Sequence, residues 1–435
     1  MREMLKPGQY LHHRGLDMIR VEKFIGSGGQ GEVYEVSVSR SPMALKWYYP
    51  SHSTELQARL IDRLCEIGPP NDFFLWPTHR ITDRKTPGFG YLMPLRPAHY
   101  RSIIDLMKRR VDPSFRTLIL AALHLTDSFK RLHDKGFCYR DISFGNVFFD
   151  HRTGEVLICD NDNIAREEDG DPGVLGTPRF MAPELVVGTG RPSLSSDLYS
   201  LSVLLFYLFF IHHPLEGRLE TEIRCFDLPA MTRLYGTHPV FIFDPDNRVN
   251  RPVPKLHDNA LIYWQLYPRF LRDLFTRAFT AGLTDPEARI PESEWLRGLE
   301  KLLVSIQHCR CGAENFYDVA RVREGVEHSR CWACQSTVAL PPRMRLRDEV
   351  IVLSSDTPLF AHQVTGARRN YHALYGRVLS HPTEPGRLGL ENLSAESWQA
   401  VWPDGRTQAV DSGRTISLED GLRIQFPQLM AEIRK

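Results

Sequence analysis

Two residues of this chain have the types and the spacing to do chemistry together: Asp141 and, five positions later, Asn146. A carboxylate can orient an attacking hydroxyl group and accept its proton, and an amide oxygen can hold a metal ion, so the pair suits phosphoryl transfer. The pair alone is weak, because aspartate and asparagine are also common in turns and caps. Its interpretation therefore depends on companion motifs elsewhere in the chain.

A glycine-rich stretch with the pattern G-x-G-x-x-G-x-V occupies residues 26–33. The same glycine spacing occurs where a strand turns into a helix in dinucleotide-binding folds. Here residues 32–38 alternate as a strand does, so the pattern favours a hairpin whose backbone covers phosphates. A flexible hairpin without a ligand is the alternative. The residues expected at the nucleotide are Gly26, Ser27, Gly28, Gly29, Gln30, Gly31 and Val33.

A lysine, Lys46, ends an apolar strand at residues 43–46. A lysine in such a place needs a partner or a ligand, and beside a phosphate-covering loop the ligand is an α- or β-phosphate of a nucleotide. Residues 55–67 predict a helix that supplies a carboxylate to hold this lysine. Glu55 and Glu66 are the candidates, and Glu55 is preferred because Glu66 falls at the end of the helix.

A second acidic position follows the buried strand predicted at residues 156–159. Asp160 directly follows this strand and is the preferred carboxylate for a metal ion, while Asp162 is its rival. A helix is predicted at residues 114–135, just before the Asp141 stretch, from its apolar periodicity. Three further nucleotide contacts are expected, one on the Lys46 strand and two on a strand that runs into a hinge: Ala44, Met93 and Leu95.

In this order the motifs resemble those of a eukaryotic-type protein kinase, over roughly residues 15–305. The resemblance implies an α+β, bilobal fold with a small lobe at about 15–95, a large lobe at about 96–305, and ATP between them. It implies that Lys46 holds the phosphates, that Asp141 is the base, and that Asn146 and Asp160 bind Mg²⁺ or Mn²⁺. The segments at 176–184 and 196–201 complete the order of the motifs, and the resemblance implies a pair between Glu184 and Arg289 and a brace of the catalytic loop by Asp197.

Three positions depart from the pattern of that family. Tyr139 stands where a histidine is usual, Ser143 replaces a lysine that contacts the transferring phosphate, and residues 160–162 read Asp-Asn-Asp instead of Asp-Phe-Gly. The expected function is an ATP-dependent Ser/Thr protein kinase that acts on protein hydroxyl groups. A pseudokinase that serves as a nucleotide-binding scaffold and a small-molecule kinase of the same fold are the alternatives.

The loop that follows the second acidic position carries several carboxylates. They are Glu167, Glu168, Asp169 and Asp171. In kinases with an arginine before the catalytic aspartate, a phosphate on this loop usually neutralises the arginine. No hydroxyl residue lies between Asp160 and Gly176, so the hypothesis is that one of the carboxylates pairs with Arg140 permanently. A solvated acidic turn is the alternative.

A cysteine cluster follows the region that resembles a kinase. Cys309 and Cys311 are separated by one residue, Cys331 and Cys334 by two, and the two pairs by 19. Zinc prefers tetrahedral sites of four thiolates, so the spacing predicts a structural Zn²⁺ ribbon at 306–340. Iron is a less favoured occupant, and four unrelated thiols are the alternative.

Short β runs and turns fill residues 341–435 and predict a small β-sandwich. Gly376-Arg377 faintly resembles a forkhead-associated module, and this resemblance implies a phosphoprotein partner. A role in dimerisation or in another protein interaction is the alternative. The order of the three parts resembles bacterial kinases found with tellurium-resistance proteins.

The composition of the chain limits the classes of partner and the cellular location that we expect. A net charge of +1 gives no field that would attract nucleic acid or an anionic membrane. The apolar run at 198–211 is too short to cross a bilayer and predicts a buried helix instead. The first 20 residues lack the apolar core of a signal peptide. We therefore expect a cytoplasmic protein whose partner is a protein substrate.

Overall fold

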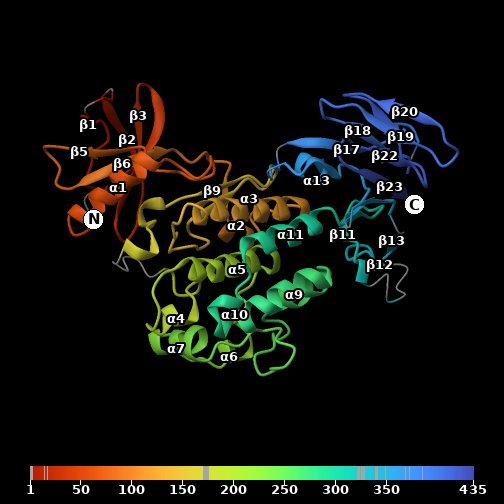
Figure 1. The fold of residues 1–435 in the computed structure, drawn as a ribbon. Helices are drawn as coiled ribbons and strands as arrows, with labels where there is room; N and C mark the ends of the chain where they lie inside the picture. Colours follow the sequence, from red (N-terminus) through yellow and green to blue (C-terminus); the bar gives the residue numbers. More distant parts are fainter. Residues whose placement is uncertain are drawn as a thin grey trace.

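The computed structural model describes residues 3–13, 15–16, 18–169, 176–320, 324, 329–338, 341–347, 349–367, 369–371, 373–384 and 386–435. Four parts follow one another along the chain, namely a small lobe, a large helical lobe, a cysteine-bearing ribbon and a β-sandwich (Figure 1). Among the described residues, no helix has both the length and the apolar character needed to cross a membrane.

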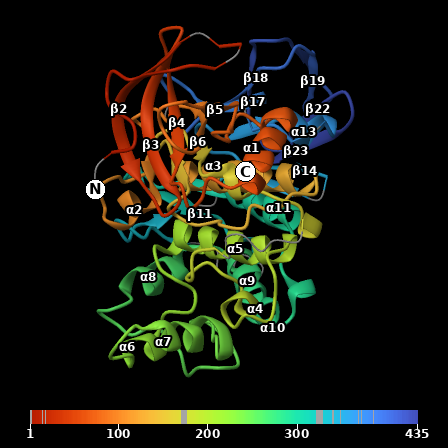
Figure 2. The same cartoon turned by 90° about the vertical axis from the view of Figure 1, so that its left-hand side faces the viewer.

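The small lobe is an antiparallel sheet with one long helix. Its strands lie in the order β1-β2-β3-β4-β6-β5, and their side chains bury a compact apolar cluster that includes Tyr34, Leu45 and Trp47. The sheet lies above the helices of the large lobe (Figure 2). The elements are β1 (Tyr10–Leu11), β2 (Ile19–Ser27), β3 (Gly31–Val38), β4 (Ser41–Tyr48), α1 (Glu55–Ile67), β5 (His79–Thr82) and β6 (Phe89–Pro94).

The large lobe is built around two helices, α3 (Phe115–His133) and α5 (Leu194–Phe210). Ser114 caps α3 by accepting a hydrogen bond from the Thr117 N–H, and basic residues fill the last turn, where they suit the helix dipole. Almost every side chain of α5 is buried, as expected for a helix that is apolar all round. The buried helix predicted from the apolar run at 198–211 is therefore confirmed.

Shorter elements complete the large lobe and frame the site. The strands β7 (Arg101–Ser102), β8 (Val147–Phe149) and β9 (Val156–Ile158) form a small sheet in the order β7-β8-β9. The helices are α2 (Ile103–Met107), α4 (Pro183–Val186), α6 (Arg218–Thr221), α7 (Leu228–Thr232), α8 (Asp258–Leu266), α9 (Arg269–Ala278), α10 (Ala281–Thr284) and α11 (Glu292–Leu303).

Two small hairpins form the ribbon, β10 (Ile306–His308) with β11 (Glu314–Phe316), and β12 (Ser329–Arg330) with β13 (Thr337–Val338). The ribbon packs on the large lobe through aromatic rings. Phe115, at the start of α3, lies with its ring centroid 5.1 Å from Phe316 and 6.1 Å from Trp332, and Tyr267 lies 5.2 Å from Phe316. The ribbon is therefore anchored to the lobe from outside its own small core.

The C-terminal part is a β-sandwich of two antiparallel sheets around one apolar core, as predicted. One sheet has the order β15-β14-β23-β22-β19-β20, and the other has the order β16-β17-β18-β21. The elements are β14 (Arg343–Leu346), β15 (Glu349–Val352), β16 (Pro358–Phe360), α13 (Ala361–Thr365), β17 (Leu374–Ser380), β18 (Leu388–Asn392), β19 (Trp398–Val401), β20 (Thr407–Val410), β21 (Thr415–Ser417), β22 (Arg423–Gln425) and β23 (Met430–Arg434).

One buried carboxylate joins the sandwich to the large lobe. Glu300, on α11, accepts hydrogen bonds from Arg369 Nε at 2.8 Å and from the Tyr371 hydroxyl at 2.9 Å, and its Oε1 lies 3.1 Å from His362 Nε2. Burial raises the pKa of Glu300, but these partners outweigh burial and lower it. Val304, just after α11, contributes its side chain to the core of the sandwich.

Candidate functional site

A cleft of about 690 Å³ lies between the glycine-rich hairpin and the large lobe. It brings together positions from residue 25 to residue 163, so strands and loops far apart in the sequence share one surface. Every residue predicted at the nucleotide or as catalytic lines this cleft except Glu55. The lining residues that were predicted are Gly26, Ser27, Gly28, Gly29, Gln30, Gly31, Val33, Ala44, Lys46, Met93, Leu95, Asp141, Asn146 and Asp160.

The glycine-rich stretch is the turn of an antiparallel hairpin between β2 and β3, as the strand pattern predicted. Gly28 N–H donates to the Gly31 carbonyl at 2.9 Å and closes the turn. A Cβ at Gly31 would lie 2.2 Å from the Trp47 carbonyl oxygen, so only glycine fits there. Gln30 reaches away from the turn, accepts from Lys46 Nζ at 3.1 Å and donates to Asn163 Oδ1 at 3.0 Å.

Lys46 points into the cleft from β4 and is almost fully buried. Its Nζ lies 2.5 Å from Asp160 Oδ1 and 2.8 Å from Asp162 Oδ2. Burial lowers the pKa of Lys46, but the two carboxylates outweigh burial and raise it. The lysine is therefore charged, and its counter-charges come from the segment after β9.

The prediction that α1 supplies the carboxylate for Lys46 is wrong. Glu55 is the first residue of α1, its side chain is 81% exposed, and it pairs with Arg59 on the same helix at 3.5 Å. Glu66, the other candidate, is also exposed. The face of α1 that meets the site instead presents Gln57, which is an amide. The helix was predicted correctly, but its rotation about its own axis was not.

The two aspartates after β9 have different environments. The Asp162 side chain is fully buried and accepts a hydrogen bond from the Tyr48 hydroxyl, whereas the Asp160 side chain is 34% exposed and lines the cleft. Burial and the nearby Asp162 charge raise the pKa of Asp160 to about 6. Burial also raises the pKa of Asp162, but Lys46 and Tyr48 outweigh it and lower the pKa. Of these two aspartates, Asp160 lines the cleft and Asp162 does not.

Asp141 accepts hydrogen bonds from two neighbouring side chains. Asn146 Nδ2 donates to Asp141 Oδ2 at 3.0 Å, and the Thr177 hydroxyl donates to Asp141 Oδ1 at 2.9 Å. Burial raises the pKa of Asp141, and these two hydrogen bonds only partly oppose that effect. Because its amide nitrogen is engaged with Asp141, Asn146 has its oxygen left for a cation. The spacing of five residues therefore places an acid and an amide side by side.

Asp197, at the start of α5, braces the catalytic loop as expected. It accepts from the Tyr139 N–H at 2.5 Å and from the Arg140 N–H at 3.0 Å, and lies 3.1 Å from His133 Nε2. His133 also bonds Glu292. Burial lowers the pKa of His133, but the hydrogen bonds to Asp197 and Glu292 outweigh burial and raise the pKa to about 9. The charged His133 thus holds Asp197 in place, and Asp197 holds the backbone of the catalytic loop.

The expected pair between Glu184 and Arg289 is confirmed. Two parallel hydrogen bonds join the guanidinium to the carboxylate, at 2.8 and 2.7 Å. Tyr139, which replaces the usual histidine, donates its hydroxyl to the Cys159 carbonyl oxygen and packs edge-on against Phe129. A buried aromatic side chain therefore connects the catalytic loop to the end of β9.

A search against family models matches residues 88–315 to the protein kinase domain. This match covers more than half of the 435 residues. The chain belongs to the protein kinase family.

Curated kinases show the same similarity at modest identity. The chain is 30% identical over 213 residues to serine/threonine-protein kinase pkn2 of Myxococcus xanthus, which covers 46% of this chain and 25% of that protein. It is 34% identical over 109 residues to serine/threonine-protein kinase PknA of Nostoc, covering 23% of this chain and 19% of that protein. It is 24% identical over 246 residues to protein kinase gsk31 of Schizosaccharomyces pombe, covering 54% of this chain and 62% of that protein. The chain thus spans a quarter or less of the two bacterial relatives.

Several side chains of the kinase cleft were not predicted. Arg96 stacks over the Phe148 ring, with its guanidinium carbon 4.1 Å from the ring centroid. The signal for Phe148 was the apolar run directly after Asn146, since alternate residues of a strand face the same side. Arg96 follows the hinge and carries no such signal. The other lining residues that were not predicted are Ile25, Leu75, Tyr91, Pro94, Gly145, Cys159 and Asn163.

The acidic loop makes several contacts among the described residues, and the hypothesised pair with Arg140 stays a prediction. Asp169 pairs with Arg63 of α1 at 3.2 Å, and Glu167 accepts a hydrogen bond from the Leu194 N–H at 2.6 Å. Arg140 donates to the Arg166 carbonyl oxygen at 3.1 Å. The fourth acidic residue of the hypothesis, Asp171, lies outside the described residues. The loop therefore connects α1 to the start of α5.

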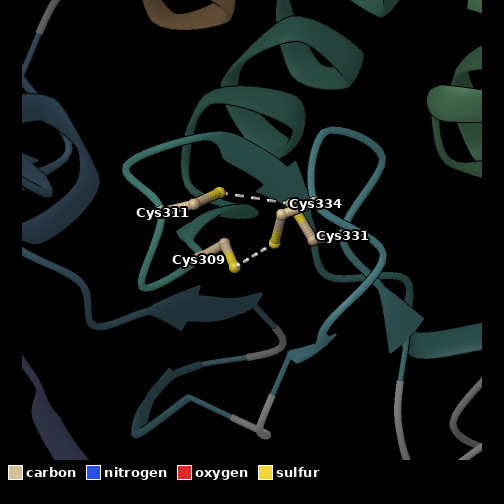
Figure 3. A group of neighbouring side chains, drawn as sticks. All are labelled: Cys309, Cys311, Cys331 and Cys334. Carbon is tan, nitrogen blue, oxygen red and sulfur yellow. Dashed lines mark hydrogen bonds between the residues drawn. The ribbon is translucent and has the colours of Figure 1, made fainter.

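The four cysteines of the ribbon converge (Figure 3). Cys309 Sγ lies 3.6 Å from Cys334 Sγ, Cys311 Sγ lies 3.7 Å from Cys331 Sγ, and all four sulfurs lie within 4.8 Å of one another. These separations are far longer than a disulfide bond of about 2.05 Å. Zinc–sulfur bonds of about 2.3 Å in a tetrahedron place sulfurs roughly 3.8 Å apart, so the donor set fits zinc.

Proposed function

We propose that this chain is an ATP-dependent Ser/Thr protein kinase. The observation that carries the proposal is the convergence of Lys46, Asp141, Asn146 and Asp160 on one cleft beneath a glycine-rich hairpin. The names of the two bacterial relatives support the Ser/Thr class. The substrate would be a hydroxyl group of a protein.

The cleft offers a contact for each part of the nucleotide. The hairpin backbone would cover the phosphates, and Lys46 would hold the α- and β-phosphates. Ala44, Met93 and Leu95 line the part of the cleft near the hinge, where the base would lie. Asn146 and Asp160 would hold Mg²⁺ or Mn²⁺, which when bound neutralises charge on the phosphates.

Asp141 would act as the base. The substrate oxygen attacks the γ-phosphorus, the bond to the β-γ bridging oxygen breaks, and the hydroxyl proton passes to the Asp141 carboxylate, which leaves ADP and a phosphoprotein. Burial raises the pKa of Asp141, and this makes it a better proton acceptor once it is ionised. Thr177 and Asn146 hold the carboxylate in one orientation, so catalysis depends mainly on positioning.

The test is phosphoryl transfer by the full chain with labelled ATP, with candidate proteins and small molecules as acceptors. Asp141→Asn should leave ATP binding near normal and lower transfer by roughly 10²–10⁴-fold. Asp246→Asn, an exposed position, is the matched control. Transfer at the wild-type rate by the Asp141 variant would refute the assigned base. Binding without transfer to any acceptor would favour a pseudokinase, and transfer to a small molecule alone would favour the other alternative.

For the ribbon, the proposal is a structural Zn²⁺ held by Cys309, Cys311, Cys331 and Cys334. Four protein ligands leave no open position, so the ion would stabilise the fold and take no part in transfer. The domain limits proposed are 15–305 for the kinase domain, 306–340 for the ribbon and 341–435 for the sandwich. The sandwich is proposed as the site of a phosphoprotein or dimer contact.

The cytoplasm of a bacterium is the proposed location. The proposed zinc site requires its four cysteines to stay reduced, and a reducing compartment suits this requirement. The two bacterial relatives support the bacterial origin.

A further inference from the structure

Lys46 has no carboxylate partner on α1, although this helix packs beside the cleft. We propose that Asp162 is the positioning residue for Lys46, in place of a glutamate on α1. The inference rests on the proposed function, in which Lys46 holds the phosphates of ATP. It assigns a role to the third residue of the Asp-Asn-Asp turn and separates that role from metal binding.

The first support is the geometry around Asp162. Its side chain is fully buried, its Oδ2 lies 2.8 Å from Lys46 Nζ, and the same oxygen accepts a hydrogen bond from the Tyr48 hydroxyl. Lys46 and Tyr48 are two residues apart on β4, so both point to the same face of the strand. The Asp162 carboxylate therefore contacts β4 through two neighbouring side chains on the same face of the strand.

The second support is the contrast with Asp160. Asp160 lies against Lys46 as well, but it is partly exposed and lines the cleft, where a metal ion would compete with the lysine for its oxygens. Asp162 is absent from the lining of the cleft. Its contact with Lys46 can therefore persist when nucleotide and metal are bound, whereas that of Asp160 must be shared.

The third support is the way in which α1 meets this pair. Gln57 Nε2 donates to the Tyr48 hydroxyl at 3.0 Å and to the Asp162 carbonyl oxygen at 2.9 Å. The helix thus contacts Tyr48 and Asp162 through a neutral amide, and among the described residues it makes no ion pair with Lys46. It follows that a displacement of α1 would leave the ion pair of Lys46 intact.

Metal binding by Asp162 is the rival explanation, because its Oδ1 is buried and has no hydrogen-bond partner among the described residues. The two explanations differ in what limits activity. A positioning role predicts weaker ATP binding with an unchanged Mg²⁺ requirement. A metal-binding role predicts that more Mg²⁺ is needed for half-maximal transfer.

The experiment compares Asp162→Asn, Lys46→Met and the double variant in the full chain, with Glu55→Gln as the matched carboxylate-to-amide control. Each single change should weaken ATP binding about tenfold, which is the loss of one charge-assisted contact. The double variant should bind ATP no more weakly than Lys46→Met, because both changes remove the same interaction. Glu55→Gln should bind as the wild type does, and the Mg²⁺ requirement of Asp162→Asn should not change.

Additive losses in the double variant, or a higher Mg²⁺ requirement in Asp162→Asn, would overturn the inference. Thermal unfolding keeps it testable if a single variant folds poorly. Lys46→Met leaves the Asp162 charge buried without its partner, so the double variant should unfold at a higher temperature than Lys46→Met. A double variant that unfolds no higher would also overturn it. Failure of the proposed function would look different, since the wild type would then transfer no phosphate while the unfolding comparison still held.

Discussion

The kinase cleft and the four-cysteine ribbon hold their chemically active side chains in different ways. Lys46, Asp141 and Asp160 rest on a cleft whose walls belong to large apolar cores, and each is fixed by side chains from other elements. The ribbon has a much smaller core, made of Cys309, Cys331, Val338 and partly buried Ala313. In the cleft, the packed cores of the two lobes position the site residues. In the ribbon, the core is so small that the four cysteines and their metal ion must stabilise the fold.

This difference predicts opposite consequences of mutation. A change at the cleft should lower activity and leave the lobes folded, because the surrounding cores are intact. A change at the cysteines should unfold the ribbon and leave the cleft able to bind nucleotide. The rings of Phe316 and Trp332 against Phe115 are the route by which damage could spread.

The largest expected effect tests the ribbon side of the comparison. The wild type should carry one zinc ion, and Cys331→Ser should lose it and unfold the ribbon, because structural zinc in small domains contributes on the order of 10–16 kcal/mol. Elemental analysis gives the metal content, and hydrogen exchange reports the unfolded segment. Cys225→Ser, at an exposed cysteine outside the cluster, is the control. Absence of zinc from the wild-type protein would contradict the proposal that a metal ion stabilises the ribbon.

The next effect tests the stability of the large lobe. Arg289→Met should lower the free energy of unfolding by about 3 kcal/mol, because it leaves the Glu184 carboxylate without its bidentate partner. Arg277→Met removes an exposed pair with Glu294 and should cost only about 0–1 kcal/mol. Chemical denaturation measures both, and the zinc content should stay unchanged. Equal losses in the two variants would show that burial of the Arg289 pair is unimportant.

A smaller effect depends on pH. The pKa of His133 is about 9 in the folded chain, above its usual 6.5, so its stabilising charge is fully present below about pH 6.5 and lost as the pH rises through about 9. The stability difference between the wild type and His133→Gln should shrink over that range, by up to about 3 kcal/mol at about 1.4 kcal/mol per pH unit. His238→Gln, at an exposed position, should show no such trend. A pH-independent difference would mean that His133 is neutral.

The smallest effect concerns the acidic loop. Arg63→Gln removes the ion pair between Arg63 and Asp169. Because the side chains of both residues are more than a third exposed, the rate of phosphoryl transfer should change less than about fivefold. At high salt, which screens the pair, the rate should not change. Arg59→Gln, on the same helix, is the control. Collapse of activity in the Arg63 variant would show that the loop, through α1, controls the cleft. The cleft would then depend on a surface contact as well as on the apolar cores around it.

Local patterns were enough to predict most of the cleft. The glycine spacing, the lysine at a strand end, and the acid and amide five residues apart each follow from a short stretch of chain. Asp141, Asn146 and Asp160 consequently lie on the cleft as predicted. The helix α1 and the strands around the glycine turn could also be predicted from the sequence, because both depend on periodicity within about ten residues.

The partner of Lys46 could not be predicted in that way. Which face of α1 meets the site depends on how the helix packs, and this is decided by buried residues such as Ile61 and Leu64 together with the strands they cover. Asp162 is buried because Tyr48 and Lys46 reach it from a strand more than a hundred positions earlier. No local pattern carries that contact. The order of strands in the sandwich was hidden for the same reason.

The carboxylate of Glu300 has a practical consequence for anyone who wishes to isolate the catalytic part. A polypeptide that stops at residue 305 would lose all three side chains that surround this acid, and would expose Val304, which lies in the core of the sandwich. Since α11 packs along α3, the damaged end would border the helix that leads into the catalytic loop. We expect such a fragment to be poorly soluble, and a shortened protein that keeps residues 306–371 to retain the three partners of Glu300. The unit of expression is therefore longer than the unit of sequence similarity.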